Sequence, residues 1–306
     1  MAENPVPPRL ALRIGDRLVD HGDKGETITV RSPYDGHVVG TVPAGTELDL
    51  DDAVATALVR HRAGALEAHE RAAILDRAAQ RLADPAVQET FARSIAEEAA
   101  KPIRTARIEA ARAVDTFRFS AAAARTTAGE LVPLDASSAA AGSGKLGFVL
   151  RVPIGVVAAI SPFNFPLNLV AHKIAPAIAA GCPVVLKPAS STPLTALRLA
   201  NLLIDECGLP PGWLNVVACS GRVADHLVTH PDVRLVTFTG SPEVGWGIKA
   251  RAPRAKVNLE PSLYVLLNRI GDSQPVRAAV LADTLGVTPS TISRQVSQLE
   301  SRGRKR

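Results

Sequence analysis

The sequence predicts an α/β protein in which a doubly wound, Rossmann-like parallel sheet with helices on both faces precedes a small all-α tail. Between residues 154 and 260, short β-branched runs alternate with segments of helical length. This alternation favours a parallel sheet, because each parallel crossover needs a helix between its strands. After residue 260 the strand pattern stops and helix-start signals replace it. We therefore expect one domain over residues 1–260 and a second over residues 261–306.

Composition narrows the class of protein. The 306 residues are 46% hydrophobic, which is enough apolar material for one large or two ordinary domains. No stretch approaches the roughly 18 uncharged apolar residues of a membrane helix, and the polar start does not match a signal peptide. We therefore expect a cytoplasmic protein. The three cysteines are odd in number and lack metal-ligand spacing, so neither a disulfide framework nor a metal site is expected.

The first half of the chain predicts short strands followed by long helices. Residues 10–46 alternate short apolar runs with Gly and Asp turn signals, a pattern typical of strands and hairpins. Residues 51–129 are Ala-rich, with apolar residues spaced three and four apart as in amphipathic helices. The sequence Gly142-Ser143-Gly144 then indicates a flexible junction.

Strands and helices alternate after this junction. The predicted strands are residues 154–160, 184–187, 214–217, 235–238 and 256–259. The predicted helices between them are residues 167–180, 193–207, 222–229 and 242–252. Sheets of this kind bind ligands just beyond the carboxyl ends of their strands. Functional residues are therefore expected in the segments that follow the strands.

Polar residues follow four of the five strands. The carboxamide of Asn164, flanked by prolines, could donate to a developing oxyanion. Lys187 and Ser190 could hold a ribose, and backbone N–H groups from Thr239 onward could meet a phosphate at a helix start. Glu260 could act as a general base. Each residue alone also has an ordinary structural interpretation, such as a turn cap, a solvated lysine or a helix entry without ligand.

Taken together, the order and spacing of these segments resemble the aldehyde dehydrogenase superfamily over about residues 12–260. Residues 32–36, 154–156 and 230–232 match the family as well. The resemblance implies an oxidoreductase that acts on an aldehyde with NAD or NADP. It also implies that Asn164 donates to the oxyanion of a thiohemiacetal and that Glu260 activates the hydrolytic water. A family member can be oligomeric, and the sequence does not identify the aldehyde.

The resemblance also assigns a cofactor site. The residues it implies are Phe163, Asn164, Lys187, Pro188, Ala189, Ser190, Thr239, Gly240 and Ser241. Many NAD-specific members carry Glu where this chain has Ser190, and that carboxylate binds the adenosine ribose. Because Ser190 carries no charge to repel a 2′-phosphate, we expect NADP⁺ to be tolerated or preferred.

The resemblance ends at Glu260. In the family this residue begins a Glu-Leu-Gly-Gly motif, and the nucleophilic cysteine lies further along the chain. Here Pro261 follows, and no cysteine occurs after Cys219. Cys219 is not expected to substitute, because the family places this position near the adenine half of the cofactor. The resemblance therefore implies a truncated, catalytically incomplete member of the family.

Residues 261–306 carry a separate helical pattern. The spacing of Ala282, Gly286 and Ile292 indicates a helix-turn-helix and resembles the DNA-reading segment of MarR-type regulators. The outward residues at its second helix are Ser290, Thr291, Arg294 and Gln295, which suit base edges and phosphates. This segment has seven basic and three acidic residues, so weak, salt-sensitive DNA binding is expected.

Three alternatives remain open at this stage. The tail could be an ordinary helical hairpin with a solvated basic end. The chain could be a transcriptional regulator in which an NAD(P)-binding domain senses redox state. It could also join two unrelated gene fragments.

Overall fold

The computed structural model describes residues 7–22, 25–136 and 144–257. The chain divides into two compact units, residues 1–241 and 242–306, and each is described by itself. Glu260 and the predicted helix-turn-helix, including Ser290, Thr291, Arg294 and Gln295, lie outside the described residues. DNA binding by this segment stays a prediction from the sequence.

The first unit is built around a six-stranded mixed sheet with the strand order β10-β7-β8-β9-β1-β2. Strands β10, β7, β8 and β9 run parallel to one another. Strand β1 pairs antiparallel with both β9 and β2. The strand bounds are β7 (Val156–Ile160), β8 (Val184–Lys187), β9 (Leu214–Val216), β10 (Val233–Phe238), β1 (Leu12–Ile14) and β2 (Arg17–Val19). The Rossmann-like α/β prediction is therefore confirmed, but the purely parallel sheet is corrected to a mixed one.

The added strand β1 covers an edge of the parallel sheet. It pairs with β9, and all three of its residues are buried. Asn215 of β9, which is fully buried, accepts a hydrogen bond from the backbone N–H of Gly15 at 2.8 Å. Unpaired strand edges expose backbone donors and acceptors, so this pairing protects β9. The hairpins expected in the amino-terminal segment are present, because β1 pairs antiparallel with β2 and β3 pairs antiparallel with β4.

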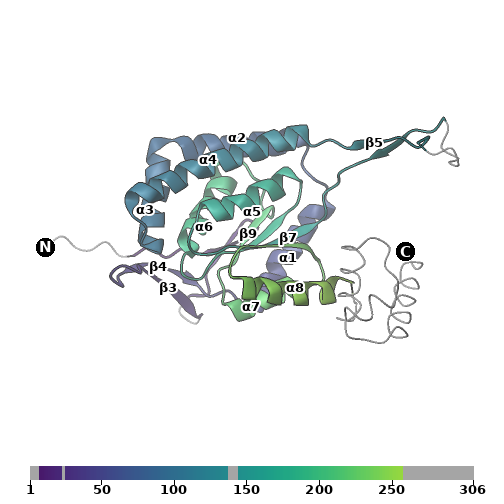
Figure 1. Ribbon diagram of the computed structural model, residues 1–306. Coiled ribbons are helices and arrows are strands. Elements are labelled where there is room, and N and C mark those ends of the chain that lie inside the picture. Colours follow the sequence, from purple (N-terminus) through teal and green to yellow (C-terminus); the bar gives the residue numbers. More distant parts are fainter. Residues whose placement is uncertain (1–6, 23–24, 137–143, 258–306) are drawn as a thin grey trace. The chain divides into compact units, whose positions relative to one another are not determined.

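Helices cover both faces of the sheet, as predicted (Figure 1). One face carries α5 (Asn168–Ala179) and α6 (Pro193–Asn201), which continues as a π-helical turn over Leu202–Glu206. The other face carries α1 (Glu47–Arg62) and α7 (Gly221–Thr229). The long helices expected from the Ala-rich region pack over α5 and α6 as a further layer. They are α2 (Ala68–Ala83), α3 (Pro85–Ala99) and α4 (Ile103–Thr126).

Three of these helices begin with a side-chain cap, but the two that lead away from the predicted site do not. Thr46, Asp84 and Ser220 cap α1, α3 and α7 by accepting backbone N–H bonds. The residues that precede α5 and α6 make no such bond. Buried carboxylates from α3 and α4 take over this role, as described below.

Two small hairpins complete the first unit. The strands β3 (Thr27–Arg31) and β4 (Val38–Pro43) form an antiparallel pair within residues 10–46, where strands and hairpins were predicted. The strands β5 (Glu130–Val132) and β6 (Gly147–Val149) form a second pair, which extends away from the helices of this unit (Figure 1). The sequence predicted only a flexible junction here, of which residues 142 and 143 lie outside the described residues.

The second unit begins with α8 (Pro242–Val257). The sequence predicted that this helix ends at residue 252 and that a fifth strand begins at residue 256. The strand prediction is wrong for residues 256 and 257, because both belong to α8. Apart from one proline, residues 249–256 are Ala, Arg and Lys, whose high helix propensity favours continuation of the helix. The remaining residues of the predicted strand lie outside the described residues.

Candidate functional site

Three of the four segments predicted to carry chemistry lie within the described residues, and they begin side by side at one edge of the sheet. In the registered strands, Ile160 lies opposite both Lys187 and Phe238. The backbone N–H of Ser161 donates to the Lys187 carbonyl at 3.2 Å, and that of Thr239 donates to the Ile160 carbonyl at 3.2 Å. The chain runs from β7 through β8 to β9 on one side and then returns to place β10 on the other side of β7, so the strand order reverses here. This switch point is where open α/β sheets bind ligands.

Lys187 ends β8 in a buried position, with its side chain only 8% exposed. Burial lowers the pKa of its ammonium group. Ser190 lies further along the same segment, and its hydroxyl donates to the Cys219 carbonyl at 2.9 Å. The Ser190 oxygen can therefore still accept a hydrogen bond but has already used its proton. Pro188 is buried and Ala189 is half-buried between these two residues.

Phe163 and Asn164 are exposed in the loop that follows β7. The backbone carbonyl of Asn164 accepts a hydrogen bond from the Lys101 ammonium at 2.6 Å. Lys101 also lies 3.9 Å above the ring of Phe165. Among the described residues, the Asn164 carboxamide makes no hydrogen bond, so its N–H groups stay available to a ligand.

The partner of Lys101 is Glu109 on α4, at 2.5 Å. Glu109 is buried, and its other oxygen accepts the backbone N–H groups of Leu167 and Asn168 at 3.0 and 3.2 Å. Glu109 therefore caps α5, while Lys101 anchors the loop that precedes this helix. The sequence analysis missed both residues, because they lie far along the chain from Asn164 and no local pattern distinguishes them from other charged helix residues.

Glu98 on α3 caps the start of α6, as Glu109 caps α5. It is fully buried and accepts the N–H groups of Leu194 at 2.6 Å and Thr195 at 2.9 Å, together with the Thr195 hydroxyl. Burial raises the pKa of its carboxyl to about 7, against the lowering effect of these hydrogen bonds. The segment from Lys187 to α6 is thus fixed at its far end, just as the Asn164 loop is.

Thr239 follows β10, and Lys173 of α5 donates to its hydroxyl at 2.8 Å. Lys173 is 6% exposed, and burial lowers the pKa of its ammonium group to about 8. A lysine between apolar neighbours in the predicted helix 167–180 was the signal that could have identified it. Gly240 and Ser241 are exposed beyond Thr239. A Cβ atom at Gly240 would lie 2.4 Å from the ring of Phe238, so a side chain there would displace that ring.

The three cysteines are all buried and unpaired as disulfides. Burial raises the pKa of the Cys207 thiol to about 11, and it raises that of the Cys219 thiol to about 11 although Lys187 acts in the opposite direction. Since the thiolate is the nucleophilic form, neither is activated. Over the described ranges, no group of three or more His, Cys, Asp or Glu side chains could hold a metal ion. The described helices are also all too short or too polar to span a bilayer.

Comparison with known proteins agrees with this architecture. The sequence profile described as "Aldehyde dehydrogenase family" matches residues 20–262. The chain is 42% identical over 236 residues to 3-sulfolactaldehyde dehydrogenase from Priestia aryabhattai, which covers 77% of this chain and 48% of that protein. The chain thus spans about half the length of the curated relatives it matches.

Solved structures give the same result. Aldehyde dehydrogenase 21 from Physcomitrella patens, in complex with the reaction product succinate, superimposes with a TM-score of 0.75 at 40% identity, covering 82% of this chain and 51% of that one. The NADP-dependent glyceraldehyde-3-phosphate dehydrogenase from Bacillus halodurans C-125, complexed with NADP, has a TM-score of 0.75 at 34% identity, covering 80% of this chain and 51% of that one. The chain therefore belongs to the aldehyde dehydrogenase family.

Proposed function

We propose that residues 1–260 form an NAD(P)⁺-binding domain of an oxidoreductase that acts on aldehydes. The observation that carries this proposal is the convergence of residues 161–166, 187–190 and 239–241 at the switch point of the sheet. The similar Bacillus halodurans enzyme, whose structure contains NADP, supports the choice of cofactor. A nicotinamide cofactor held by these residues would supply the acceptor for a hydride.

The residues at this edge fit a dinucleotide. The buried Lys187 ammonium can donate to a ribose hydroxyl, and the Ser190 oxygen can accept from one because its own proton is used at Cys219. Phe163, Pro188 and Ala189 supply apolar walls. Gly240 and Ser241 are exposed just after β10, so their backbone N–H groups can come near a phosphate. Thr239, held by Lys173, is the proposed neighbour of the nicotinamide.

The same proposal assigns two catalytic roles. Asn164, whose loop is anchored by Lys101, would donate to the oxyanion, and Glu260 would act as general base. No thiolate nucleophile is proposed among the cysteines of the 306-residue chain, because all three are buried. We therefore propose that this chain binds the cofactor without oxidising an aldehyde on its own.

Calorimetric titration with NADP⁺ and NAD⁺ tests the site. We expect Lys187→Ala to weaken NADP⁺ binding by about tenfold, the size of one charge-assisted hydrogen bond. The matched control is Lys145→Ala, which removes an exposed lysine and should leave the affinity unchanged. NAD⁺ should bind no more tightly than NADP⁺, since Ser190 carries no repelling charge. Equal effects of the two lysine substitutions would contradict the assigned site.

A further inference from the structure

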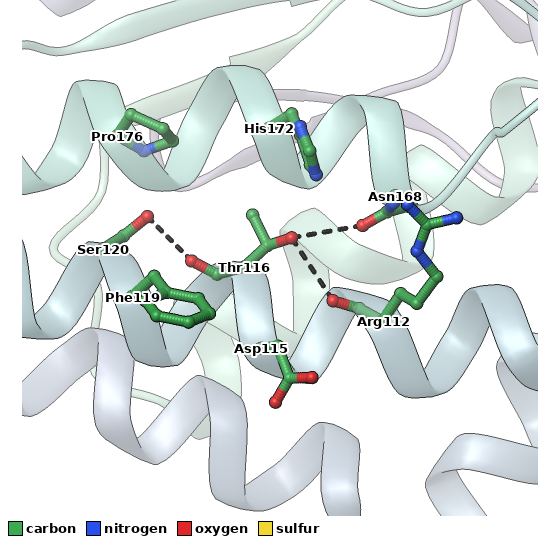
Figure 2. A pocket seen from close by; sticks show the side chains of 8 residues that line it. All are labelled: Arg112, Asp115, Thr116, Phe119, Ser120, Asn168, His172 and Pro176. Carbon is green, nitrogen blue, oxygen red and sulfur yellow. Dashed lines mark hydrogen bonds between the residues drawn. The ribbon is translucent and has the colours of Figure 1, made fainter.

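The first unit has a pocket at the amino edge of its sheet, where β7 and β10 begin. The groove between α4 and α5 that Figure 2 shows adjoins the candidate site, because it includes Asn168 close to the Asn164 loop. The amino-edge pocket is separate from that site and has a volume of about 520 Å³, within the range of small-molecule sites. The length of β7, about 13 Å at the usual rise per residue, separates it from the carboxyl edge.

The lining of the amino-edge pocket combines apolar residues with charged or titratable ones. It comes from the last turns of α1, from the segment that enters β7 and from the start of β10. The apolar part is Leu58, Ile154, Gly155 and Val156, and the charged or titratable part is His61, Arg62, Asp232 and Arg234.

Side chains from α1 and β10 converge over Gly155. The backbone of this residue has a φ of +124°, a conformation that favours glycine. A Cβ atom at this position would lie 2.7 Å from Cγ of Arg234 and 3.8 Å from Nε2 of His61. The missing side chain therefore lets an arginine of β10 and a histidine of α1 approach the same point at the floor of the pocket.

The charge that faces this pocket is not balanced by the protein. Among the described residues, neither the Arg62 nor the Arg234 guanidinium makes an ion pair or a hydrogen bond, and Asp232 is the single acid in the lining. Arg60, in the same turn of α1 as Arg62, instead donates to the Pro211 carbonyl at 2.9 Å. Basic residues in a last turn complement the helix dipole, but this does not account for an arginine on a separate strand.

We propose that the amino-edge pocket binds a phosphate monoester of a small molecule. The phosphate dianion would lie between Arg62 and Arg234, because guanidinium groups with free N–H donors match phosphate oxygens in a bidentate manner. The imidazole of His61 can donate to it in either protonation state. The organic part of the ligand would lie against Leu58 and Ile154. This site is distinct from the proposed cofactor site and does not depend on it.

The test is a titration of the complete 306-residue chain with phenyl phosphate, followed by ³¹P NMR. We expect Arg62→Gln and Arg234→Gln each to weaken binding by about fivefold to tenfold, as for loss of a charge-assisted hydrogen bond. Arg104→Gln is the matched control, since Arg104 is also exposed but lies outside the pocket, and this variant should bind like the wild type. Inorganic phosphate should bind more weakly than phenyl phosphate, because it has no apolar part.

Three results would overturn the proposal. The first is equal affinity of the wild type and both pocket variants for phenyl phosphate, with circular dichroism showing that each is folded. The second is inorganic phosphate that binds as tightly as phenyl phosphate, since the apolar wall would then contribute nothing. The third is displacement of phenyl phosphate by NAD⁺, which has no phosphate monoester, because the ligand would then occupy the cofactor site. Binding that depends on Arg62 and Arg234 and persists in saturating NAD⁺ would support it.

Discussion

Among single residues, two charged side chains far away in the sequence hold the Asn164 loop and the start of α5. Lys101 joins the Asn164 carbonyl, the Phe165 ring and the Glu109 carboxylate, and Glu109 in turn caps α5. Breaking one partner of a buried ion pair leaves the other charge desolvated and unpaired. The geometry of the Asn164 loop is therefore linked to the stability of the α4–α5 contact.

Lys101→Met should lower the free energy of unfolding by about 2 kcal/mol, because Glu109 loses its charged partner but keeps two backbone donors. Urea denaturation measures this change. Arg107→Met on α4, the helix that carries Glu109, is the control, since its pair with Glu89 is exposed and should cost about 0.5 kcal/mol or less. Lys101→Arg should recover part of the loss. An equal effect of Lys101→Met and Arg107→Met would contradict the anchoring role.

A second prediction concerns Glu98, whose pKa is raised on folding, whereas the pKa of a carboxyl group is more often lowered. Its pKa in the folded protein is raised from 4.5 to about 7, so the folded state binds more protons than the unfolded state between those values. The contribution of Glu98 to stability therefore falls as pH rises through this window. Glu98→Gln cannot titrate, so the stability advantage of the wild type over this variant should shrink from about pH 4.5 to about pH 7.

Denaturation curves of both proteins across this range provide the measurement. An advantage that is constant, or that grows with pH, would show that Glu98 stays ionised in the folded state. Glu89 serves as a comparison, because its exposed pair with Arg107 lowers its pKa and the corresponding variant should show the opposite trend.

Among the secondary-structure elements, those set by local sequence pattern could be predicted, and those set by pairing between distant segments could not. Strands β7 and β8 and helices α5 and α7 follow from apolar runs and periodicity, so their positions could be predicted closely. The pairing of β1 with β9 could not, because it joins residues that are about two hundred positions apart and depends on the buried Asn215. The β5–β6 pair was missed because its exposed strands lack a buried face that would impose alternation.

The same reasoning explains the site. Lys187, Asn164 and Thr239 could be placed at or after strand ends from the sequence, because the rule about strand ends needs only the sequence. Lys101, Glu109 and Lys173 were missed because they reach the site from the helical layer. Contacts of this kind depend on how helices cross, which a single sequence does not encode locally.

Asn215→Ala should lower the free energy of unfolding by about 2 kcal/mol, because it leaves the Gly15 N–H without its buried acceptor. Asn215 also donates to the carbonyls of Gly212 and Val184, at 3.1 and 3.3 Å. Thermal or urea unfolding provides the measurement. The control Asn201→Ala loses only a 3.4 Å contact with Arg13 and should cost less. Similar losses for both variants would argue against Asn215 as the link between β1 and β9.

For the whole molecule, we distinguish cofactor binding from turnover. The strand ends, the buried Lys187 and the tertiary caps of α5 and α6 lie within residues 1–241. The described structure gives no activated thiol, because the cysteines are buried. The family assignment therefore supports dinucleotide binding by this chain more directly than aldehyde oxidation.

The turnover prediction is tested by absorbance at the NADPH band. With saturating NADP⁺ and succinic semialdehyde, we expect the 306-residue chain to produce no NADPH above the background without protein. Alkylation by iodoacetamide should be slow for the folded chain and fast after unfolding, since burial protects all three thiols. Robust NADPH formation that is lost on alkylation would show that one of these cysteines is a working nucleophile.

The central claim is that the carboxyl edge of this sheet binds a dinucleotide. Calorimetric titration of the unmodified 306-residue chain with NADP⁺ tests it most directly. The account predicts saturable binding at one site per chain and a higher unfolding temperature at saturation, because the ligand binds the folded state. Heats no larger than dilution with both NADP⁺ and NAD⁺, on a chain shown by circular dichroism to be folded, would contradict it.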